Sequence, residues 1–219
     1  MLSPRLQKIA DMLLPPEIKK PPKAVCDIGT DHAKVPIYLI RNGVKHVIAT
    51  DIKHGPAFIA RENIREAGLG FEIDIRIGSG FAPIGADEAD AAIIAGIGGM
   101  TICDILFDGV PRGVDTLVLQ PMTAKHKLRR FLSRNGFIIV NEELVAEGDK
   151  LYNIIVAKRG VELFTDEVSI LIGQKLIQKK HLLLETHISR EIEKLESKIR
   201  WRAEQKHIDL LAQVKELLD

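Results

Sequence analysis

The chain has 219 residues, 31 of them basic and 30 acidic, which does not indicate a globally basic nucleic-acid binder but allows a local basic patch. Apolar residues make up 46% of it, as in globular proteins. No apolar run approaches the roughly 20 residues of a membrane span, and the charged, Pro-containing N-terminus is a poor secretory signal. Two cysteines cannot form a disulfide scaffold or a four-thiolate zinc site, so we expect a cytoplasmic protein.

Short β-branched or aliphatic runs alternate with helix-sized segments in the first part of the chain, which predicts crossover connections and a mainly parallel sheet. The last two runs are separated only by Gly148 and Asp149, which predicts an antiparallel hairpin at the sheet edge. The predicted strands are 24–28, 46–51, 72–77, 90–95, 114–120, 136–145 and 151–158. The predicted helices between and before them are 3–14, 33–42, 55–68, 100–109 and 124–135.

The end of the chain has a different pattern, because no Pro or Gly follows Gly173. Apolar residues there follow a four–three–four spacing typical of a coiled-coil seam, at Ile188, Ile192, Leu195 and Ile199. We predict two or three helices, arranged as an antiparallel hairpin with a break near 201–208. The chain would then divide into an α/β domain, 1–160, and a helical domain, 161–219. The alternative is that these helices pack only on themselves or on a second subunit.

The first predicted strand ends in Asp27-Ile28-Gly29-Thr30-Asp31-His32. An acid at a strand end, followed by Gly and a turn into a helix, is typical of a nucleotide-type site. Only one glycine of the dinucleotide fingerprint is present. Asp27 would repel a pyrophosphate but favour a cation, so a ligand with an α-amino acid and a sulfonium fits better. The alternative is a plain turn in which Asp27 or Asp31 caps the helix.

The ends of the next two strands carry weaker signals. Asp51 closes the second strand, where an acid commonly binds the hydroxyls of a ribose, although it could instead cap the following helix. After the third strand, Ser79 could hydrogen-bond an adenine edge and Phe81 could cover its face, next to Gly80. A plain tight turn is almost as compatible with this segment.

The fourth and fifth strand ends complete the set. Gly96, Gly98 and Gly99 form a loop that most often allows a ligand to touch the backbone; phosphate binding is the rival, but no P-loop Lys-Ser/Thr pair follows. Gln120 and Pro121 could present an amide and a carbonyl to a planar base, or could simply end the strand. Outside His32, the histidines show no metal-ligand spacing, so we expect no metal.

These motifs resemble the bacterial tRNA (adenine-22-N1)-methyltransferase family, a branch of the class I S-adenosylmethionine-dependent methyltransferases. The resemblance is carried by Asp27–Ala33, Ile94–Met100, Leu119–Pro121, Tyr152 and the opening Leu2–Leu6. It covers residues 1–160 well, and 161–219 only as a helical domain. It implies an α/β fold: a Rossmann-like seven-stranded sheet with a reversed final hairpin, followed by a helical, coiled-coil-like C-terminal domain.

The resemblance also implies S-adenosylmethionine as cofactor, bound across the carboxyl ends of the first four strands. The residues expected to hold it are Asp27, Gly29, Thr30, Asp51, Ile52, Ser79, Gly80, Ala95, Gly96, Gly98 and Gly99. Two positions depart from the family pattern. Ser79 stands where the family usually has Asp, and Met122 stands where it usually has Asn.

The implied reaction is in-line attack of adenine N1 on the sulfonium methyl. We expect Asp31 and His32 to orient the base or accept its amino proton, and Gln120 to read a base edge. The residues expected to contact tRNA are Pro121, Lys125, Arg129, Lys194, Lys198 and Arg202, although a solvated helix face would also explain the basic ones. We expect a monomer or weak homodimer.

Two other classes of function stay open. One is a methyltransferase with the same cofactor that acts on another RNA, a protein or a small molecule. The other is a non-catalytic binding protein whose helical tail recruits a partner.

Overall fold

The computed structural model describes residues 2–14, 21–162 and 166–218. The strands are β1 (Ala24–Ile28), β2 (His46–Asp51), β3 (Ile73–Ile77), β4 (Ala91–Ile97), β5 (Thr116–Pro121), β6 (Phe137–Glu147) and β7 (Lys150–Arg159). The helices before and between them are α1 (Pro4–Asp11), α2 (Lys34–Arg41), α3 (His54–Glu66), α4 (Gly99–Asp108) and α5 (Lys125–Arg134). The predicted strands at 24–28 and 46–51 coincide with β1 and β2, and every other predicted strand end lies within two residues of the observed one.

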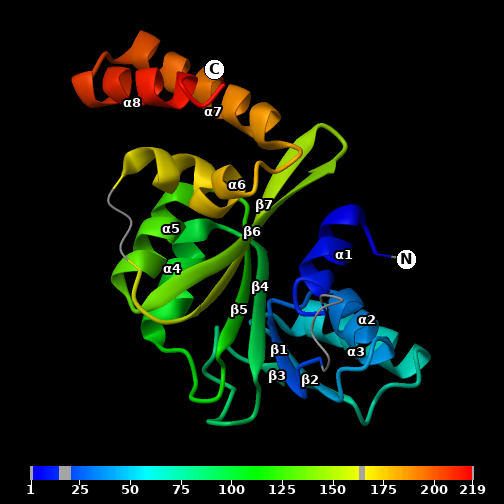
Figure 1. The fold of residues 1–219 in the computed structure, drawn as a ribbon. Helices are drawn as coiled ribbons and strands as arrows, with labels where there is room; N and C mark the ends of the chain where they lie inside the picture. The colour runs from blue at the N-terminus through cyan, green and yellow to red at the C-terminus, as the bar shows by residue number, and fades with distance from the viewer. Residues whose placement is uncertain (1, 15–20, 163–165, 219) are drawn as a thin grey trace.

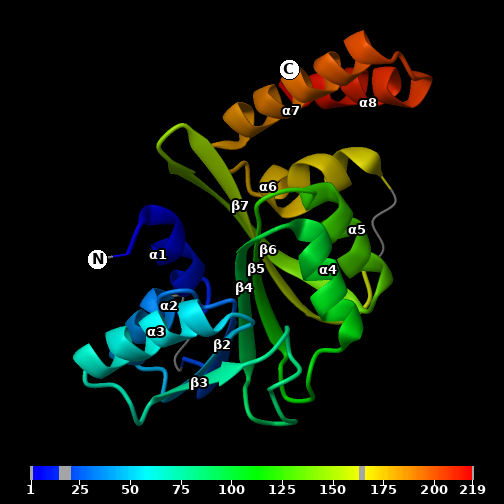
Figure 2. The same cartoon turned by 180° about the vertical axis from the view of Figure 1, so that it is seen from behind.

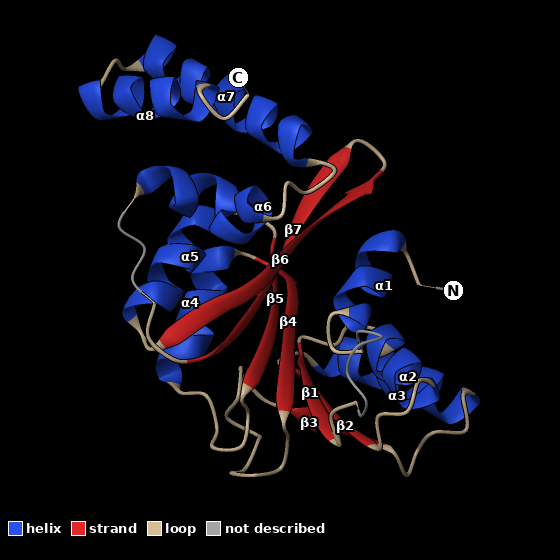
Figure 3. Ribbon diagram, in the orientation of Figure 1, coloured by secondary structure: helices blue, strands red, loops and turns tan. Residues whose placement is uncertain are grey.

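The seven strands form one sheet in the order β3-β2-β1-β4-β5-β7-β6. The first five pair in parallel, whereas β7 is antiparallel to both β5 and β6. Helices α1, α2 and α3 cover one face, and α4 and α5 cover the other (Figures 1 and 3). Each face has its own apolar core, because successive side chains of a strand point to opposite faces. The predicted Rossmann-like sheet with a reversed final hairpin is therefore confirmed.

The C-terminal part contains η1 (Ser169–Gly173), α6 (Gln174–Gln178), α7 (Leu184–Trp201) and α8 (Gln205–Lys215). Helices α7 and α8 lie side by side above the rest of the molecule in both views (Figures 1 and 2). The buried apolar residues of this hairpin are Ile188, Leu195 and Val214, which pack with Ile172 of η1. The predicted helical hairpin is present, and the chain leaves α7 at Arg202, inside the predicted break. The coiled-coil geometry stays a prediction.

Arg129, predicted to contact tRNA, is fully buried in this structure, so that prediction is wrong. Its Nε donates to Oε1 of Glu142 on β6 at 2.7 Å. Its two Nη atoms donate to the carbonyl oxygens of Ile170, Leu171 and Ile172 at 2.9–3.2 Å. A buried charge requires a charged partner and hydrogen bonds, and Arg129 has the Glu142 carboxylate and three backbone carbonyl groups. It fastens η1 to the sheet and has no surface to offer a phosphate.

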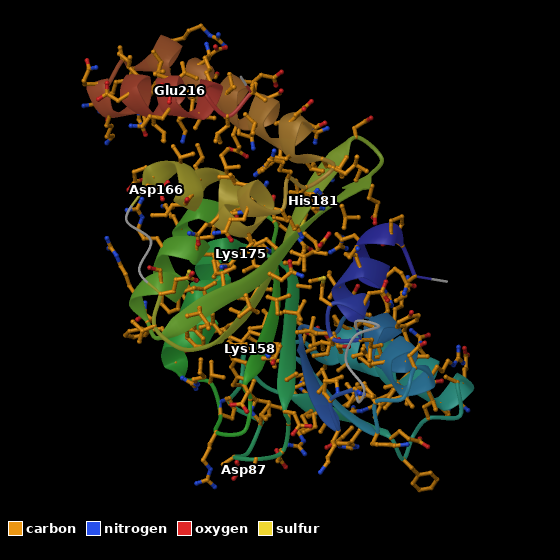
Figure 4. The ribbon with its side chains drawn as sticks, in the orientation of Figure 1. Asp87, Lys158, Asp166, Lys175, His181 and Glu216 are labelled. Atoms are coloured by element: carbon orange, nitrogen blue, oxygen red, sulfur yellow. The ribbon has the colours of Figure 1, made fainter. Side chains whose placement is uncertain are left out.

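Further polar contacts hold the C-terminal part against β6. Lys179 Nζ donates to the Asn141 side chain at 3.1 Å and also contacts the Glu143 carboxylate. His181 Nε2 lies 3.0 Å from Glu143 Oε2, and its Nδ1 accepts from the backbone of Leu183 at 3.0 Å. Figure 4 labels His181 where the chain passes from α6 toward α7. The entry to the helical hairpin is therefore tied to the sheet and is not a free linker.

Both cysteines, Cys26 and Cys103, are free and buried, and burial raises the pKa of the Cys26 thiol to about 12. None of the described helices combines the length and hydropathy that a membrane crossing needs. Within the described ranges, no three His, Cys, Asp or Glu side chains gather as metal ligands would.

Arg129→Met would leave the Glu142 carboxylate buried without its cation. We expect the free energy of unfolding to fall by about 3–5 kcal/mol, because an unpaired buried charge is strongly destabilising. Urea denaturation followed by circular dichroism measures this loss. The control is Arg112→Met, which removes an exposed ion pair with Asp87 and should leave the midpoint near that of the wild type. Equal midpoints for the two variants would contradict the fastening role of Arg129.

Candidate active site

The carboxyl ends of the parallel strands meet at one edge of the sheet, where the strand order reverses between β1 and β4. Ligands of open α/β sheets bind at such a reversal. The loop after β1 folds across the end of β2, because the backbone amides of Gly29 and Thr30 both donate to the Thr50 carbonyl oxygen, at 2.8 and 2.9 Å. Gly29 has φ +79°, and a Cβ there would meet no atom within 4 Å, so the backbone lies open.

The two alternatives in which acids cap helices do not hold. Helix α2 begins after Ala33, which adopts a left-handed conformation, and no side chain caps its first amides. Helix α3 likewise lacks a side-chain cap. The Asp51 carboxylate instead accepts from the backbone N–H of Lys53 at 2.8 Å. The free amides of α2 therefore point out of the helix N-terminus as a site for an anionic group.

Asp27 is the most buried acid of this edge, with 6% of its surface exposed. Burial raises the pKa of its carboxyl to about 6, the neighbouring Thr30 hydroxyl pulls the pKa down, and the negative charge of Asp51 pushes it up. A cation bound at Asp27 would favour the ionised form and replace the lost hydration.

Asp31 and His32 extend the same loop into solvent. His32 Nε2 lies 3.5 Å from Asp31 Oδ2, with 40% and 69% of the respective side chains exposed. Asn63 of α3 fixes the loop, since its Nδ2 donates to the His32 carbonyl oxygen at 2.8 Å. Among the described residues, Asp27, Asp31 and Asp51 have no ion pair with Lys or Arg. The edge formed by β1 and β2 is thus acidic and uncompensated.

The loop after β3 lies beside this acidic edge, because the Gly78 amide donates to the Asp51 carbonyl oxygen at 3.1 Å. Ser79 and Gly80 follow directly, and their contact with an adenine stays a prediction. Phe81 is only 6% exposed and packs in the core, which leaves it little surface with which to cover an adenine. Ile52, on the loop after β2, is 65% exposed and supplies an apolar surface near Asp51.

The glycines of the loop after β4 have structural roles besides the ligand contact that the sequence predicts for them. The β4–β5 register shifts between Ala95 and Ile97, and Gly96 at the shift is exposed with φ +80°. A Cβ on Gly99 would lie 2.5 Å from the Thr123 carbonyl oxygen, so glycine there is required by the close approach of the loop after β5. At Gly98, the nearest atom to a Cβ would be 3.4 Å away, in ordinary contact.

Gln120 does not face an open site, which corrects its expected contact with the base. It is fully buried, and its Oε1 accepts from Nη1 of Arg5 at 2.6 Å. The Arg5 guanidinium also lies over the Tyr152 ring, 5.1 Å from its centroid, and Nη1 would be 3.8 Å from a Cβ on Gly96. Sequence analysis missed Arg5 as a site residue. Arg5 lies in a predicted helix, and nothing in the sequence indicates that this helix reaches the ends of β4 and β5.

Pro121 is also buried, so it is not a contact residue for tRNA; the next residue, Met122, is 41% exposed at this strand end. The remaining expected contacts divide into two groups. Lys125, Lys194 and Lys198 line one cleft of about 280 Å³ between the loop after β5 and α7. The residues that share this cleft, called here the basic cleft, are Met122, Thr123, Ala124, Lys125, His126, Leu171, Glu191, Lys194, Leu195 and Lys198.

Within the basic cleft, burial lowers the pKa of Lys125 to about 8, and Glu191 opposes that shift. Lys194 and Lys198 are exposed on α7. Arg202 lies outside the cleft, beyond the end of α7, and pairs with Glu204 at 3.3 Å.

The strand order with its antiparallel β7, and the uncompensated acids that end β1 and β2, define a class I, Rossmann-like, S-adenosylmethionine-dependent methyltransferase. Comparison with known proteins narrows the class. The chain belongs to the tRNA (adenine(22)-N(1))-methyltransferase family, whose model matches residues 25–218. The resemblance drawn from the sequence is therefore confirmed.

Individual relatives agree with this assignment. The tRNA (adenine(22)-N(1))-methyltransferase of Bacillus subtilis is 32% identical over 205 residues, covering 90% of this chain and 83% of that protein. A Streptococcus pneumoniae structure in complex with S-adenosyl-L-methionine has a TM-score of 0.88 at 30% identity and covers 100% of both chains. TrmK of M. capricolum, in complex with S-adenosyl-homocysteine, has a TM-score of 0.80 at 25% identity, over 99% of this chain and 96% of that one.

The cofactor is S-adenosylmethionine, and the residues present fit it. Its ammonium and sulfonium cations match the uncompensated acids at the ends of β1 and β2, and its carboxylate matches the uncapped N-terminus of α2. Asp27 and Gly29 would hold the methionine part, and Asp51 the ribose hydroxyls. A dinucleotide pyrophosphate would meet the same acids unfavourably.

Because the cation binds the ionised form of Asp27, affinity for S-adenosylmethionine should be constant above about pH 6. Below that pH, the dissociation constant should rise toward tenfold per pH unit, as the carboxyl takes up a proton that binding must displace. Isothermal titration calorimetry from pH 5 to 8 measures this bend. Asp27→Asn should bind weakly without the bend, whereas the exposed control Asp31→Asn should keep it. A bend that survives Asp27→Asn would assign it to another group.

Arg5→Met should lower kcat/KM for tRNA by about 10- to 100-fold, the usual cost of losing a charged hydrogen bond. Affinity for S-adenosylmethionine should change much less, because the contacts of Arg5 are with Gln120, Glu147 and Tyr152 and none is with the acidic loop ends. Steady-state methylation and calorimetry separate the two effects. Lys8→Met, on the same helix but facing Glu143, is the control. A loss confined to cofactor affinity would contradict this placement.

Proposed function

We propose that this chain transfers the methyl group of S-adenosylmethionine to N1 of adenine 22 in tRNA. One observation carries the proposal: the family model spans 25–218, and so includes the acidic loop ends as well as the C-terminal helices. The acidic edge suits a cationic cofactor, whereas the basic cleft between α5 and α7 suits an RNA backbone. Both lie next to the carboxyl ends of β4 and β5.

Adenine N1 has a free lone pair, so no group has to remove a proton before the methyl is transferred. S-adenosylmethionine supplies a methyl group on a positively charged sulfur, and this charge resides on the base once N1 is methylated. The protein's task is therefore to position the base and to accommodate a positive charge, and positioning alone can supply a large rate gain.

We assign to Asp31 the role of stabilising the positive charge that develops on the base. Its carboxylate is exposed at the loop after β1, and His32 lies 3.5 Å away. A carboxylate beside the developing charge stabilises the transition state more than the ground state. His32 orients the carboxylate and can take a proton from the amino group of the methylated base. The Arg5 guanidinium, held by Gln120, bounds the other side of the site at Gly96.

The target base must leave its stack to reach this edge, because enzymes that modify a paired base extrude it first. Lys125, Lys194 and Lys198 would hold the adjoining phosphates in the basic cleft. We further propose that 1–160 form the catalytic domain and 161–219 the tRNA-binding domain, acting as a monomer or weak homodimer in the cytoplasm, where tRNA is found.

The test combines purified protein, labelled S-adenosylmethionine and unmethylated tRNA, with product nucleosides identified by mass spectrometry. We expect 1-methyladenosine from this tRNA and none from a matched tRNA in which guanine replaces adenine 22. Asp31→Ala should still bind S-adenosylmethionine but lose turnover. Full turnover by Asp31→Ala would remove that assignment. If the wild-type protein binds S-adenosylmethionine but does not methylate this tRNA, the cofactor site remains supported and the proposed tRNA substrate is refuted.

A further inference from the structure

Trp201, the only tryptophan of the chain, is the last residue of α7 and is 88% exposed. Arg202 turns the chain away from the helix in an extended conformation, and α8 begins three residues later, at Gln205. Trp201 therefore stands at the turn of the helical hairpin, between α7 and α8. The apolar core of the hairpin does not include it. A large exposed aromatic with no packing role has its ring faces available for stacking with a partner.

The chain around this indole is basic. Residues 198–207 hold four Lys or Arg and one acid, Glu204. The basic side chains of Arg202 and Lys206 are 73% and 74% exposed, and both pair with Glu204, at 3.3 and 2.7 Å. An exposed aromatic among cations is what single-stranded nucleic acid binds, because bases stack on the ring while phosphates meet the charges.

A second cleft joins this turn to the catalytic edge. It has a volume of about 560 Å³ and lies between α5, η1 and the two helices of the hairpin. It shares His126 and Lys198 with the basic cleft, and its far side is formed by Lys206 and His207. Each cleft also includes one acid, Glu191 in the first and Glu167 in the second, but Lys and Arg outnumber the acid in both. A mainly basic path therefore runs from the end of β5 to the turn that carries Trp201. Along α7, Trp201 lies seven residues beyond Lys194, which is about 10 Å of helix.

We propose that Trp201 stacks on an unpaired base of the bound tRNA, at a position distinct from the target adenine. This inference rests on the proposed tRNA substrate and adds a contact that the catalytic edge does not make. The cations near the turn hold the flanking phosphates, and the indole supplies a binding contribution that does not depend on base identity. A protein surface is the less suitable occupant, because residues 198–207, on either side of Trp201, hold four Lys or Arg against one acid, Glu204.

Intrinsic fluorescence tests the contact directly, since Trp201 is the only tryptophan and all tryptophan emission comes from it. Titration of full-length protein with tRNA should quench the fluorescence. Trp201→Ala should raise KM for tRNA about tenfold, in line with the loss of one stacked base, with kcat and affinity for S-adenosylmethionine unchanged. Trp201→Phe should restore most of the loss, because a phenyl ring still stacks. Thermal melting checks that the exposed substitution leaves the fold intact.

Salt dependence separates stacking from charge. Lys198→Ala should lower the slope of log affinity against log salt by about one unit, whereas Trp201→Ala should weaken binding at every salt concentration with the slope unchanged. Phe71→Ala is the matched control, because Phe71 is 99% exposed and lies before the start of β3, at the opposite edge of the sheet.

Three results would overturn the stacking contact. The first is an unchanged KM for Trp201→Ala in a protein that methylates tRNA. The second is an equal loss in Phe71→Ala. The third is a change in sedimentation of Trp201→Ala, which would place the indole in contact with a second copy. Absence of 1-methyladenosine with the wild-type protein would instead refute the substrate itself, and so is distinguishable from all three.

Discussion

The buried ion pair between Arg129 and Glu142 is the contact on which the working arrangement of this molecule depends. It joins α5 and β6 and, through three backbone carbonyl groups, fixes η1 and hence the helical hairpin beyond it. The basic cleft has one wall on α5 and its preceding loop and the other wall on α7. Its width is therefore set by this fastening, and the lysines of the two walls stay opposite one another.

A net charge of +1 conceals two surfaces of opposite sign. The loop ends of β1 and β2 present Asp27, Asp31 and Asp51 without a Lys or Arg partner among the described residues. The cleft beside the end of β5 is lined instead by three lysines and one acid, Glu191. The separation has a physical use, since a sulfonium cofactor and a polyanionic substrate must meet at one atom. Each surface attracts one of them and repels the other.

Arg5 and Gln120 stand between these two surfaces. The sequence predicted that Gln120 contacts the substrate. In the structure its side-chain oxygen accepts a hydrogen bond from Arg5, so the side chain that reaches the site is Arg5 of α1. The stacking of that guanidinium on Tyr152 joins α1 to β7 and completes the catalytic edge from three distant segments. The N-terminal helix is thereby part of the site and not an appendage.

The sequence by itself determined the fold class, the strand positions and the acidic loop ends, because hydrophobic periodicity and strand-end residues are local signals. It also located the helical hairpin from the absence of Pro and Gly. Only the tertiary structure decided which polar residues are free to act. Arg129 and Lys198 look alike in the sequence, yet one is buried against Glu142 and the other is exposed on α7. Their burial depends on which distant element packs over each helix face, and no local pattern encodes that contact.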